Sequence, residues 1–257
     1  MKVLVLGANG MLGHAVTEEL SKDFEVIPVT RKEVPIGFDF EPRVLDPYAA
    51  DYVINCVGVT IPFSQKDPAK TVYVNAVFPH ILADWYKDRL IHITTDCVYS
   101  GTDGKGPYTE FATTSAQNLY GLSKSLGEPK DAITIRTSII GRETHGFTGL
   151  LEWFLREANS KGIVEGYTQH LWNGVTTKEF GKICRKLMNS NHPAWLYHVH
   201  STDILKYEML LAFKKKYKLD CVIQPVDGSV CDRRLRTIHS LCESLDIPSF
   251  EEMIEEM

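Results

Sequence analysis

The sequence contains no apolar run long enough to cross a membrane. No signal peptide is expected, because the short apolar run KVLVL at 2–6 leads directly into a glycine-rich turn. The six cysteines include no C-x-x-C pair, and the histidines form no cluster with zinc spacing. The net charge is −5, and no basic face carries interleaved aromatic residues. We therefore expect a cytoplasmic protein with reduced thiols that binds no metal, membrane or nucleic acid.

Short apolar runs alternate with helix-like segments through the first half of the chain. Strands are expected over 2–6, 25–29, 52–56, 90–95 and 132–136, and helices over 12–22, 69–87 and 118–128. Such alternation is typical of βαβ units with a parallel sheet. Four prolines between 28 and 47 leave room only for a short or irregular crossover before residue 52. The pattern predicts an α/β fold with a Rossmann-like, doubly wound parallel sheet.

The first expected strand runs into Gly7, Gly10 and Gly13, spaced as G-x-x-G-x-x-G, and a helix follows. Gly7 allows the tight turn, Gly10 lets the backbone approach a pyrophosphate, and Gly13 lets the helix pack closely on the strand. The helix amino terminus then offers free N–H groups to phosphate oxygens. This context, strand then turn then helix, favours dinucleotide binding over a purely structural glycine turn.

The end of the second strand reads Val29-Thr30-Arg31-Lys32, without a carboxylate to bind the adenosine ribose of NAD. Arg31, ahead of Lys32, would instead bind a 2′-phosphate, which predicts a preference for NADP(H), with NAD(H) possible. The alternative is that both cations are solvated loop residues.

The character of the sequence changes after residue 142. Helices are expected over 147–159, 178–189, 203–217 and 250–257, and strands over 196–200 and 221–224, with Asp203 as a helix cap. We predict a dinucleotide-binding domain over 1–142. Residues 143–257 would form mainly a smaller substrate-binding lobe, with elements that return to the first domain and a cleft between the two.

Tyr120 and Lys124 are four residues apart in a helix-like segment, so they share one helix face. A lysine ammonium beside a phenol is expected to lower the pKa of that phenol, which would let it exchange a proton with a carbonyl or alcohol oxygen. Thr94, Thr95 and Asp96 end a strand, where parallel sheets bind ligands. The alternatives are a solvated helix face and ordinary turn residues.

These motifs occur together and in order. GANGMLG at 7–13, TTDCVYSG at 94–101, YGLSK at 120–124 and IRTSIIG at 135–141 resemble an extended short-chain dehydrogenase/reductase, in particular the dTDP-4-dehydrorhamnose reductase group. The resemblance extends over nearly the whole chain. It implies a reductase of 4-keto nucleotide sugars in carbohydrate biosynthesis.

The resemblance also implies roles for individual residues. Thr95, Tyr120 and Lys124 would be the catalytic set: Tyr120 the proton donor, Lys124 the residue that tunes it and holds the nicotinamide ribose, and Thr95 the residue that orients the keto oxygen. The cofactor would be held by Gly7, Asn9, Gly10, Met11, Leu12, Asp39, Phe40, Val57, Gly58, Val59 and Thr94, together with Tyr120 and Lys124.

The substrate side departs from the group's pattern. Asp96 would contact the sugar, but Ile139 stands where rhamnose reductases usually carry a tryptophan. Trp172 and Asn173 could supply the missing wall of the sugar site, and a core role for Trp172 is the alternative. The cluster Arg233, Arg234 and Arg236 could bind a nucleotide phosphate or lie on the surface.

The leading hypothesis is an NAD(P)H-dependent reductase of a keto nucleotide-diphosphate sugar, possibly a homodimer. One alternative is an epimerase or dehydratase of the same superfamily. The other is a non-catalytic NADP-binding regulatory subunit.

Overall fold

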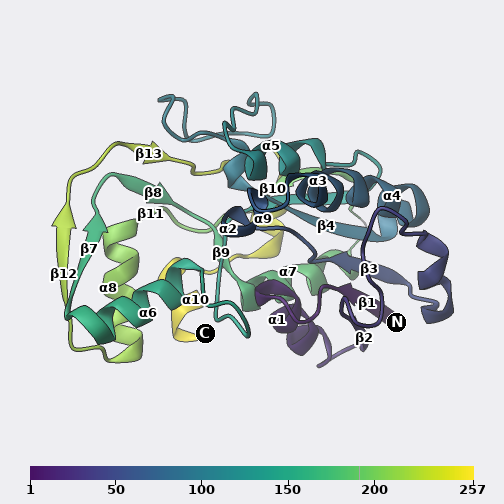
Figure 1. The fold of residues 1–257 in the computed structure, drawn as a ribbon, viewed down its shortest axis with the longest axis horizontal. Helices are drawn as coiled ribbons and strands as arrows, with labels where there is room; N and C mark the ends of the chain where they lie inside the picture. The colour runs from purple at the N-terminus through teal and green to yellow at the C-terminus, as the bar shows by residue number, and fades with distance from the viewer. Residues whose placement is uncertain (191) are drawn as a thin grey trace.

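The computed structural model describes residues 1–190 and 192–257, and a six-stranded sheet forms its centre (Figure 1). The strands follow the order β2-β1-β3-β4-β5-β10, and every neighbouring pair is parallel. Their bounds are β1 Lys2–Leu6, β2 Glu25–Val29, β3 Tyr52–Asn55, β4 Leu90–Thr95, β5 Ile133–Thr137 and β10 Trp195–His198. The strand order reverses beside β1, because β2 lies on one side of it and β3 on the other. The predicted doubly wound α/β fold is confirmed.

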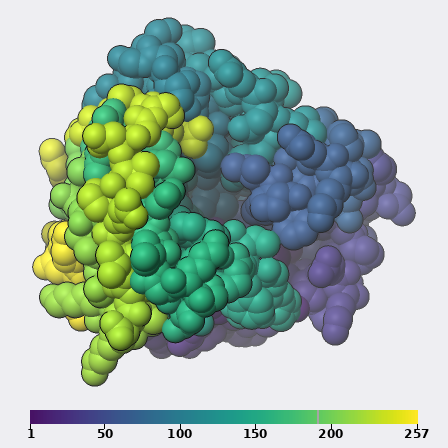
Figure 2. Space-filling model, turned by 60° about the vertical axis from the view of Figure 1, so that its left-hand side comes forward, coloured from purple at the N-terminus to yellow at the C-terminus, as the bar shows by residue number. Residues whose placement is uncertain are grey.

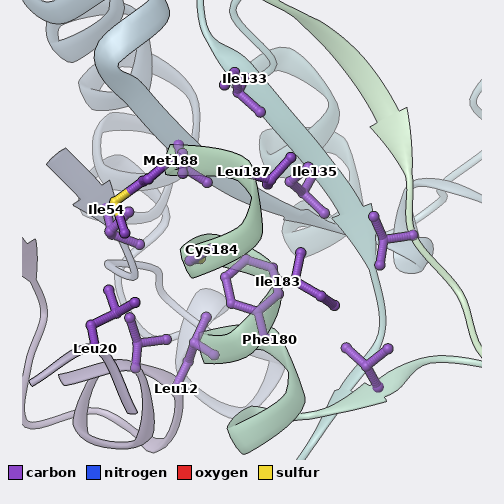
Figure 3. Close-up of a cluster of buried hydrophobic side chains, with 14 of the residues drawn as sticks. Leu12, Leu20, Ile54, Ile133, Ile135, Phe180, Ile183, Cys184, Leu187 and Met188 are labelled. Carbon is purple, nitrogen blue, oxygen red and sulfur yellow. The ribbon is translucent and has the colours of Figure 1, made fainter. Parts of the chain in front are cut away.

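Helices α1 (Met11–Leu20) and α7 (Thr177–Met188) pack against each other over one face of the sheet. In α7, Phe180, Ile183, Cys184 and Leu187 recur at helical spacing and are fully buried. Figure 3 shows these side chains between Leu12 and Leu20 of α1 and Ile133 and Ile135 of β5. Strand β10 and helix α7 come from the second half of the chain, so the second half completes the first core.

A helical run covers the opposite face, where a single helix was predicted over 69–87. It consists of α3 (Pro68–Val72), a π-helical turn η2 (Tyr73–Val77) and α4 (Phe78–Tyr86). Asp67 caps its start by accepting a hydrogen bond from the Lys70 backbone N–H. The crossover before β3 contains only the 3₁₀ segment η1 (Pro42–Tyr48), as the prolines indicated.

The second half also builds a separate core at the far end of the molecule (Figure 1). Its elements are α6 Leu150–Lys161, β7 Ile163–Tyr167, β8 His170–Trp172, β11 Ile204–Leu205, α8 Lys206–Tyr217, β12 Val222–Val226, β13 Cys231–Asp232 and α10 Phe250–Glu255. The remaining short elements are α2 Ile61–Ser64, η3 Lys87–Arg89, η4 Asp96–Val98, α5 Leu119–Leu126, β6 Ile139–Ile140, β9 Val175–Thr176 and α9 Leu241–Leu245. The short strands β6, β7, β8, β9, β11 and β13 were not predicted.

The expected cap at Asp203 is wrong. Helix α8 begins at Lys206, and the Glu208 carboxylate accepts a hydrogen bond from the Leu205 backbone N–H. The Asp203 carboxylate instead pairs with the guanidinium groups of Arg234 and Arg236, both at 2.6 Å. Two arginines offer charge-assisted hydrogen bonds, which are stronger than a capping bond to one backbone N–H.

No helix in the described part of the chain is long and apolar enough to cross a membrane. Across residues 1–190 and 192–257, no three His, Cys, Asp or Glu side chains gather as a metal-binding group would require.

A buried ion pair ties α5 to the sheet. The Arg136 guanidinium on β5 donates to the Glu128 carboxylate at 2.5 and 2.7 Å, and both side chains are at least nine-tenths buried. Arg136 also donates to the Tyr99 hydroxyl at 2.7 Å, next to the imidazole of His198 on β10. Burial lowers the pKa of His198 to about 4, so the ring is neutral at pH 7.

Replacing Arg136 with Met is expected to lower the free energy of unfolding by about 3–5 kcal/mol, because Glu128 would stay buried without its partner. Urea unfolding followed by circular dichroism measures the loss. The control is Lys161→Met, which breaks the Lys161–Glu157 pair by removing its exposed lysine and should cost less than about 1 kcal/mol. Equal losses in the two variants would contradict the assignment of Arg136 as a buried structural cation.

Candidate functional site

The glycine turn after β1 has the geometry of a dinucleotide-binding turn. Gly7 has φ +78°, and its backbone N–H donates to Val29 O at 2.9 Å. A Cβ on Gly13 would overlap the carbonyl group of Gly7, so only glycine allows α1 to lie this close to the turn. Gly10 is the N-cap of α1 and no side chain caps this helix end. The first N–H groups of α1 are therefore open to an anionic ligand.

The segment after β3 lies against this turn at the point where the strand order reverses. Val57 Cγ2 would be 3.1 Å from a Cβ on Gly7. Asn55 Oδ1 accepts from Val57 N at 3.1 Å, and the Asn75 amide bonds both N and O of Val59, at 2.8 and 2.9 Å. The residues predicted to line the cofactor cleft are thus fixed beside the glycine turn, where doubly wound sheets bind ligands.

Asn9 is exposed at the tip of the glycine turn, and its carbonyl oxygen accepts from Thr144 Oγ1 at 2.7 Å. The segment that leads into α6 therefore reaches the same turn from the second half of the chain. Figure 2 shows a hollow bordered by the blue surface of the segment after β3 and by the green and yellow-green surface of the carboxy-terminal part.

The end of β2 does carry a carboxylate, which the sequence analysis missed. Glu33 accepts hydrogen bonds from Thr30 N, at 2.9 Å, and from Thr30 Oγ1, and these bonds lower the pKa of the carboxyl group. The carboxylate is four residues past the strand, and only the turn brings it back. Arg31 and Lys32 are exposed beside it.

Phe40, which the resemblance places among the cofactor-binding residues, has its side chain in the core, and its role at the cofactor stays a prediction. Phe40 is buried and packs edge-on against Phe78, with ring centroids 5.0 Å apart. Asp39 is exposed beside it. Phe38 is 70% exposed and lies 4.9 Å from the Tyr73 ring, so it is the aromatic face that this segment offers to a ligand.

The three proposed catalytic residues gather at the carboxyl end of β4. Thr95 ends this strand, and Tyr120 and Lys124 lie on α5, which packs against β4 and the turn η4. Lys124 is 5% exposed, and its ammonium donates to Ile93 O at 2.7 Å. Thr94 Oγ1 donates to the Lys124 carbonyl at 3.4 Å. Strand and helix thus hold these side chains in one place.

The pKa of Tyr120 is raised, opposite to the direction predicted from the Tyr–Lys spacing. Burial raises this pKa, Cys97 and Asp96 raise it further, and a hydrogen bond with Thr95 opposes them. Lys124 does not lower it, because its ammonium is directed to a β4 carbonyl. Burial in turn lowers the pKa of Lys124 to about 8.

Two of the predicted sugar-site residues are structural. Trp172 is 4% exposed and packs edge-on against Phe250, with ring centroids 5.6 Å apart, so the core alternative holds. Asn173 is buried, and its side-chain amide bonds both N and O of Leu235 at 2.9 Å. Ile139 is partly buried and packs against the main core. Both side chains are therefore held by contacts within the protein, and their place in the sugar site stays a prediction.

Asp96 lies directly after Thr95 and accepts from its hydroxyl at 3.2 Å. It is buried beside the proposed catalytic residues. The thiol of Cys97 follows, and burial raises its pKa to about 12, which agrees with a packing role rather than a reactive thiolate.

Most of the nearby arginines are already engaged by carboxylates. Arg142 pairs with Glu152 at 2.7 Å, Arg234 with Asp232 at 2.8 Å and with Asp203, and Arg236 with Asp203. Arg233 differs, because it donates to backbone carbonyls of Tyr99 and Ser100 at 3.1 and 3.2 Å. Lys206, at the start of α8, was not identified from the sequence because it reads as one more cation of an amphipathic helix.

A doubly wound sheet with a glycine turn and with Thr95, Tyr120 and Lys124 at its carboxyl edge defines the class of extended short-chain dehydrogenases/reductases. The model of the RmlD substrate binding domain family matches residues 1–229. The chain belongs to this family.

Named relatives agree with this assignment. The chain is 29% identical over 236 residues to the spore coat polysaccharide biosynthesis protein SpsK of Bacillus subtilis, covering 88% of this chain and 82% of SpsK. It is 33% identical over 161 residues to a dTDP-4-dehydrorhamnose reductase of Burkholderia thailandensis, covering 61% of this chain and 54% of that protein. The match thus spans about half the length of that reductase.

The fold is shared with the crystal structure of dTDP-4-dehydrorhamnose reductase from Bacillus anthracis in complex with NADP. The TM-score is 0.83 at 22% identity, over 99% of this chain and 97% of that one.

The lowered pKa of Lys124 predicts a pH-dependent stability. The pKa of Lys124 is about 8 in the folded protein, against an ordinary value of 10.5. Between these two pH values the unfolded chain holds a proton on Lys124 that the folded chain has lost. The free energy of unfolding should therefore rise with pH across this window, by about 3 kcal/mol, and the gain is absent below pH ~8. Urea unfolding of wild type and Lys124→Met between these pH values isolates the contribution. A difference that stays flat with pH would contradict it.

Proposed function

We propose that this protein is an NADPH-dependent reductase of a keto nucleotide-diphosphate sugar. The observation that carries the proposal is the gathering of Thr95, Tyr120 and Lys124 beside an uncapped dinucleotide turn. Relatives named dTDP-4-dehydrorhamnose reductase and dTDP-4-keto-6-deoxy-D-glucose reductase, each 33% identical over part of the chain, support the substrate class.

The residues present fit a dinucleotide. Gly7, Gly10 and Gly13 leave the space, and the open N–H groups at the start of α1 suit the pyrophosphate. Val57 and Val59 would line the nicotinamide half. When bound, NADPH supplies the hydride that reduces the keto carbon.

The side chains gathered at the end of β4 would transfer the proton to the substrate. The Tyr120 hydroxyl, whose pKa burial raises, is protonated at pH 7 as an ordinary phenol is, and this is the form required of a proton donor. Thr95 would hydrogen-bond the keto oxygen and hold it toward Tyr120. The proton passes from the Tyr120 hydroxyl to that oxygen, which leaves an alcohol on the sugar and a phenolate that solvent reprotonates. The Lys124 ammonium would bind the cofactor ribose.

Tyr120→Phe removes the proton donor and should lower kcat by about 10²–10⁴-fold. The Kd for NADPH should stay nearly unchanged, since the ring and the glycine turn remain. NADPH oxidation with a panel of dTDP- and UDP-linked 4-keto sugars measures turnover, and fluorescence titration measures binding. Tyr167→Phe, on the exposed face of β7, is the matched control and should retain full activity.

The same assay separates the alternatives. An epimerase or dehydratase recycles its cofactor, so it would convert sugar without net loss of NADPH. A regulatory subunit would bind NADPH and turn over no sugar, and Tyr120→Phe would then change nothing measurable. Unchanged turnover in Tyr120→Phe would refute the proton-transfer mechanism.

Cofactor preference depends on the cations at the end of β2. Arg31→Ala should raise the Kd for NADPH by at least about tenfold, as expected for a lost charge-assisted hydrogen bond to the 2′-phosphate, and leave the Kd for NADH nearly unchanged. Lys32→Ala should have the smaller effect. Equal affinity of the wild-type protein for NADPH and NADH would contradict the preference.

A further inference from the structure

One loop from the second half of the chain reaches across to the dinucleotide turn. Residues 143–149 lie between the short strand β6 and helix α6, and the loop runs beside the start of α1 (Figure 1). The Thr144 hydroxyl donates to the Asn9 carbonyl at 2.7 Å. A Cβ on Gly149 would lie 4.0 Å from Met11 Sδ. The loop therefore contacts the glycine turn on both sides of the residue that begins α1.

The base of this loop is firmly held. The Glu143 carboxylate accepts hydrogen bonds from the backbone N–H groups of Thr148, at 3.1 Å, and of Gly149, so the loop closes on itself. The Glu143 backbone N–H donates to the buried Glu152 carboxylate of α6 at 3.1 Å. Closed loops of this length are compact surface units. We therefore expect the loop to move as one piece about a base that is fixed to the carboxy-terminal core.

The tip of the loop is much less constrained than its base. Residues 144–148 are all exposed, and Phe147 has φ +48°, a left-handed conformation that strains a bulky side chain. A groove of about 670 Å³ lies between Phe147 and the end of α8, which leaves the tip room to move away from the turn. In the part of the chain that the structure describes, the bond from Thr144 to Asn9 is the tip's only hydrogen bond to the glycine turn.

We propose that loop 143–149 is a latch on the bound dinucleotide, closed by the hydrogen bond from Thr144 to Asn9. The inference rests on the proposed function. The pyrophosphate would bind at the start of α1, beside which the loop lies, so the open latch would be the state in which the cofactor enters and leaves. Thr144 is then a positioning residue, because its hydroxyl bonds the backbone of the turn and not the cofactor.

The weakness of this latch suits a reductase. Hydride transfer converts NADPH to NADP, so the oxidised cofactor must leave in every turnover. One neutral hydrogen bond between exposed groups changes an equilibrium by only about 2- to 12-fold. The latch therefore opens readily, whereas an enzyme that recycles its cofactor in place gains nothing from frequent opening.

The rates of cofactor exchange test the latch without any sugar. Stopped-flow fluorescence measures NADPH binding and its displacement by excess NADP. Thr144→Ala removes the hydroxyl and should raise both rates by about 2- to 12-fold, the factor expected for one neutral hydrogen bond. The Kd should stay within about twofold of wild type, because a gate changes both rates together.

Two variants of the same loop serve as controls. Thr144→Ser keeps the hydroxyl and should have rates close to those of wild type. Thr148→Ala removes an exposed hydroxyl that bonds no other described residue, and it should leave both rates unchanged.

Unchanged rates in Thr144→Ala, or an equal rise in Thr148→Ala, would overturn the proposal. A Kd that rises while the binding rate stays constant would also overturn it, since this pattern indicates a lost contact with the cofactor rather than an opened gate. The test also separates the latch from the reductase. Exchange rates that depend on Thr144 in a protein that reduces no sugar would keep the latch and reject the reductase. Turnover of a keto sugar with unchanged exchange rates would do the reverse.

Discussion

The site depends on how closely α5 packs against the elements around it. A Cβ on Gly127, at the end of α5, would overlap the backbone carbonyl of Asn75 on the π-helical turn η2. Because the two backbones touch, the Asn75 amide reaches both the segment after β3 and Ser123 on α5, at 3.1 Å. One asparagine therefore links the cofactor side of the site to the helix of Tyr120 and Lys124. Such π-helical turns are common at functional sites.

Electrostatics divides the cations of this region into two kinds. Arg136, Arg142, Arg234 and Arg236 are held by carboxylates and contribute to the architecture. Lys124, Lys206 and Arg233 are buried or partly buried, and in the described residues each is held by backbone carbonyls or a ring rather than by an acid. A cation of the first kind stabilises the fold only while its carboxylate partner is present. The second kind leaves positive charge without a carboxylate partner near the carboxyl end of β4.

The strands of the sheet could be predicted from the sequence, because each is a short apolar run that the fold buries in its core. The strands at 2–6, 25–29 and 90–95 have the predicted bounds. The glycine spacing likewise predicted the turn, since a Cβ on Gly13 would overlap the backbone of Gly7. The burial of individual side chains was harder to predict. Trp172, Asn173 and Phe40 were read as ligand contacts by position, but whether such a side chain faces a ligand or a core is decided by residues distant in sequence, such as Phe250, Leu235 and Phe78.

The sequence also did not reveal which charged side chains pair with one another. Arg233, Arg234 and Arg236 form one basic cluster in the chain, but Asp203, about thirty residues away, pairs with Arg234 and Arg236 and not with Arg233. The same holds for Tyr120. Spacing alone placed the Lys124 ammonium beside the phenol, whereas the fold directs it to Ile93 O and leaves burial to raise the pKa of the phenol. A tyrosine with its ordinary pKa is already protonated at pH 7, so burial does not create the proton-donor form; it makes the Tyr120 hydroxyl a weaker acid in the unliganded site.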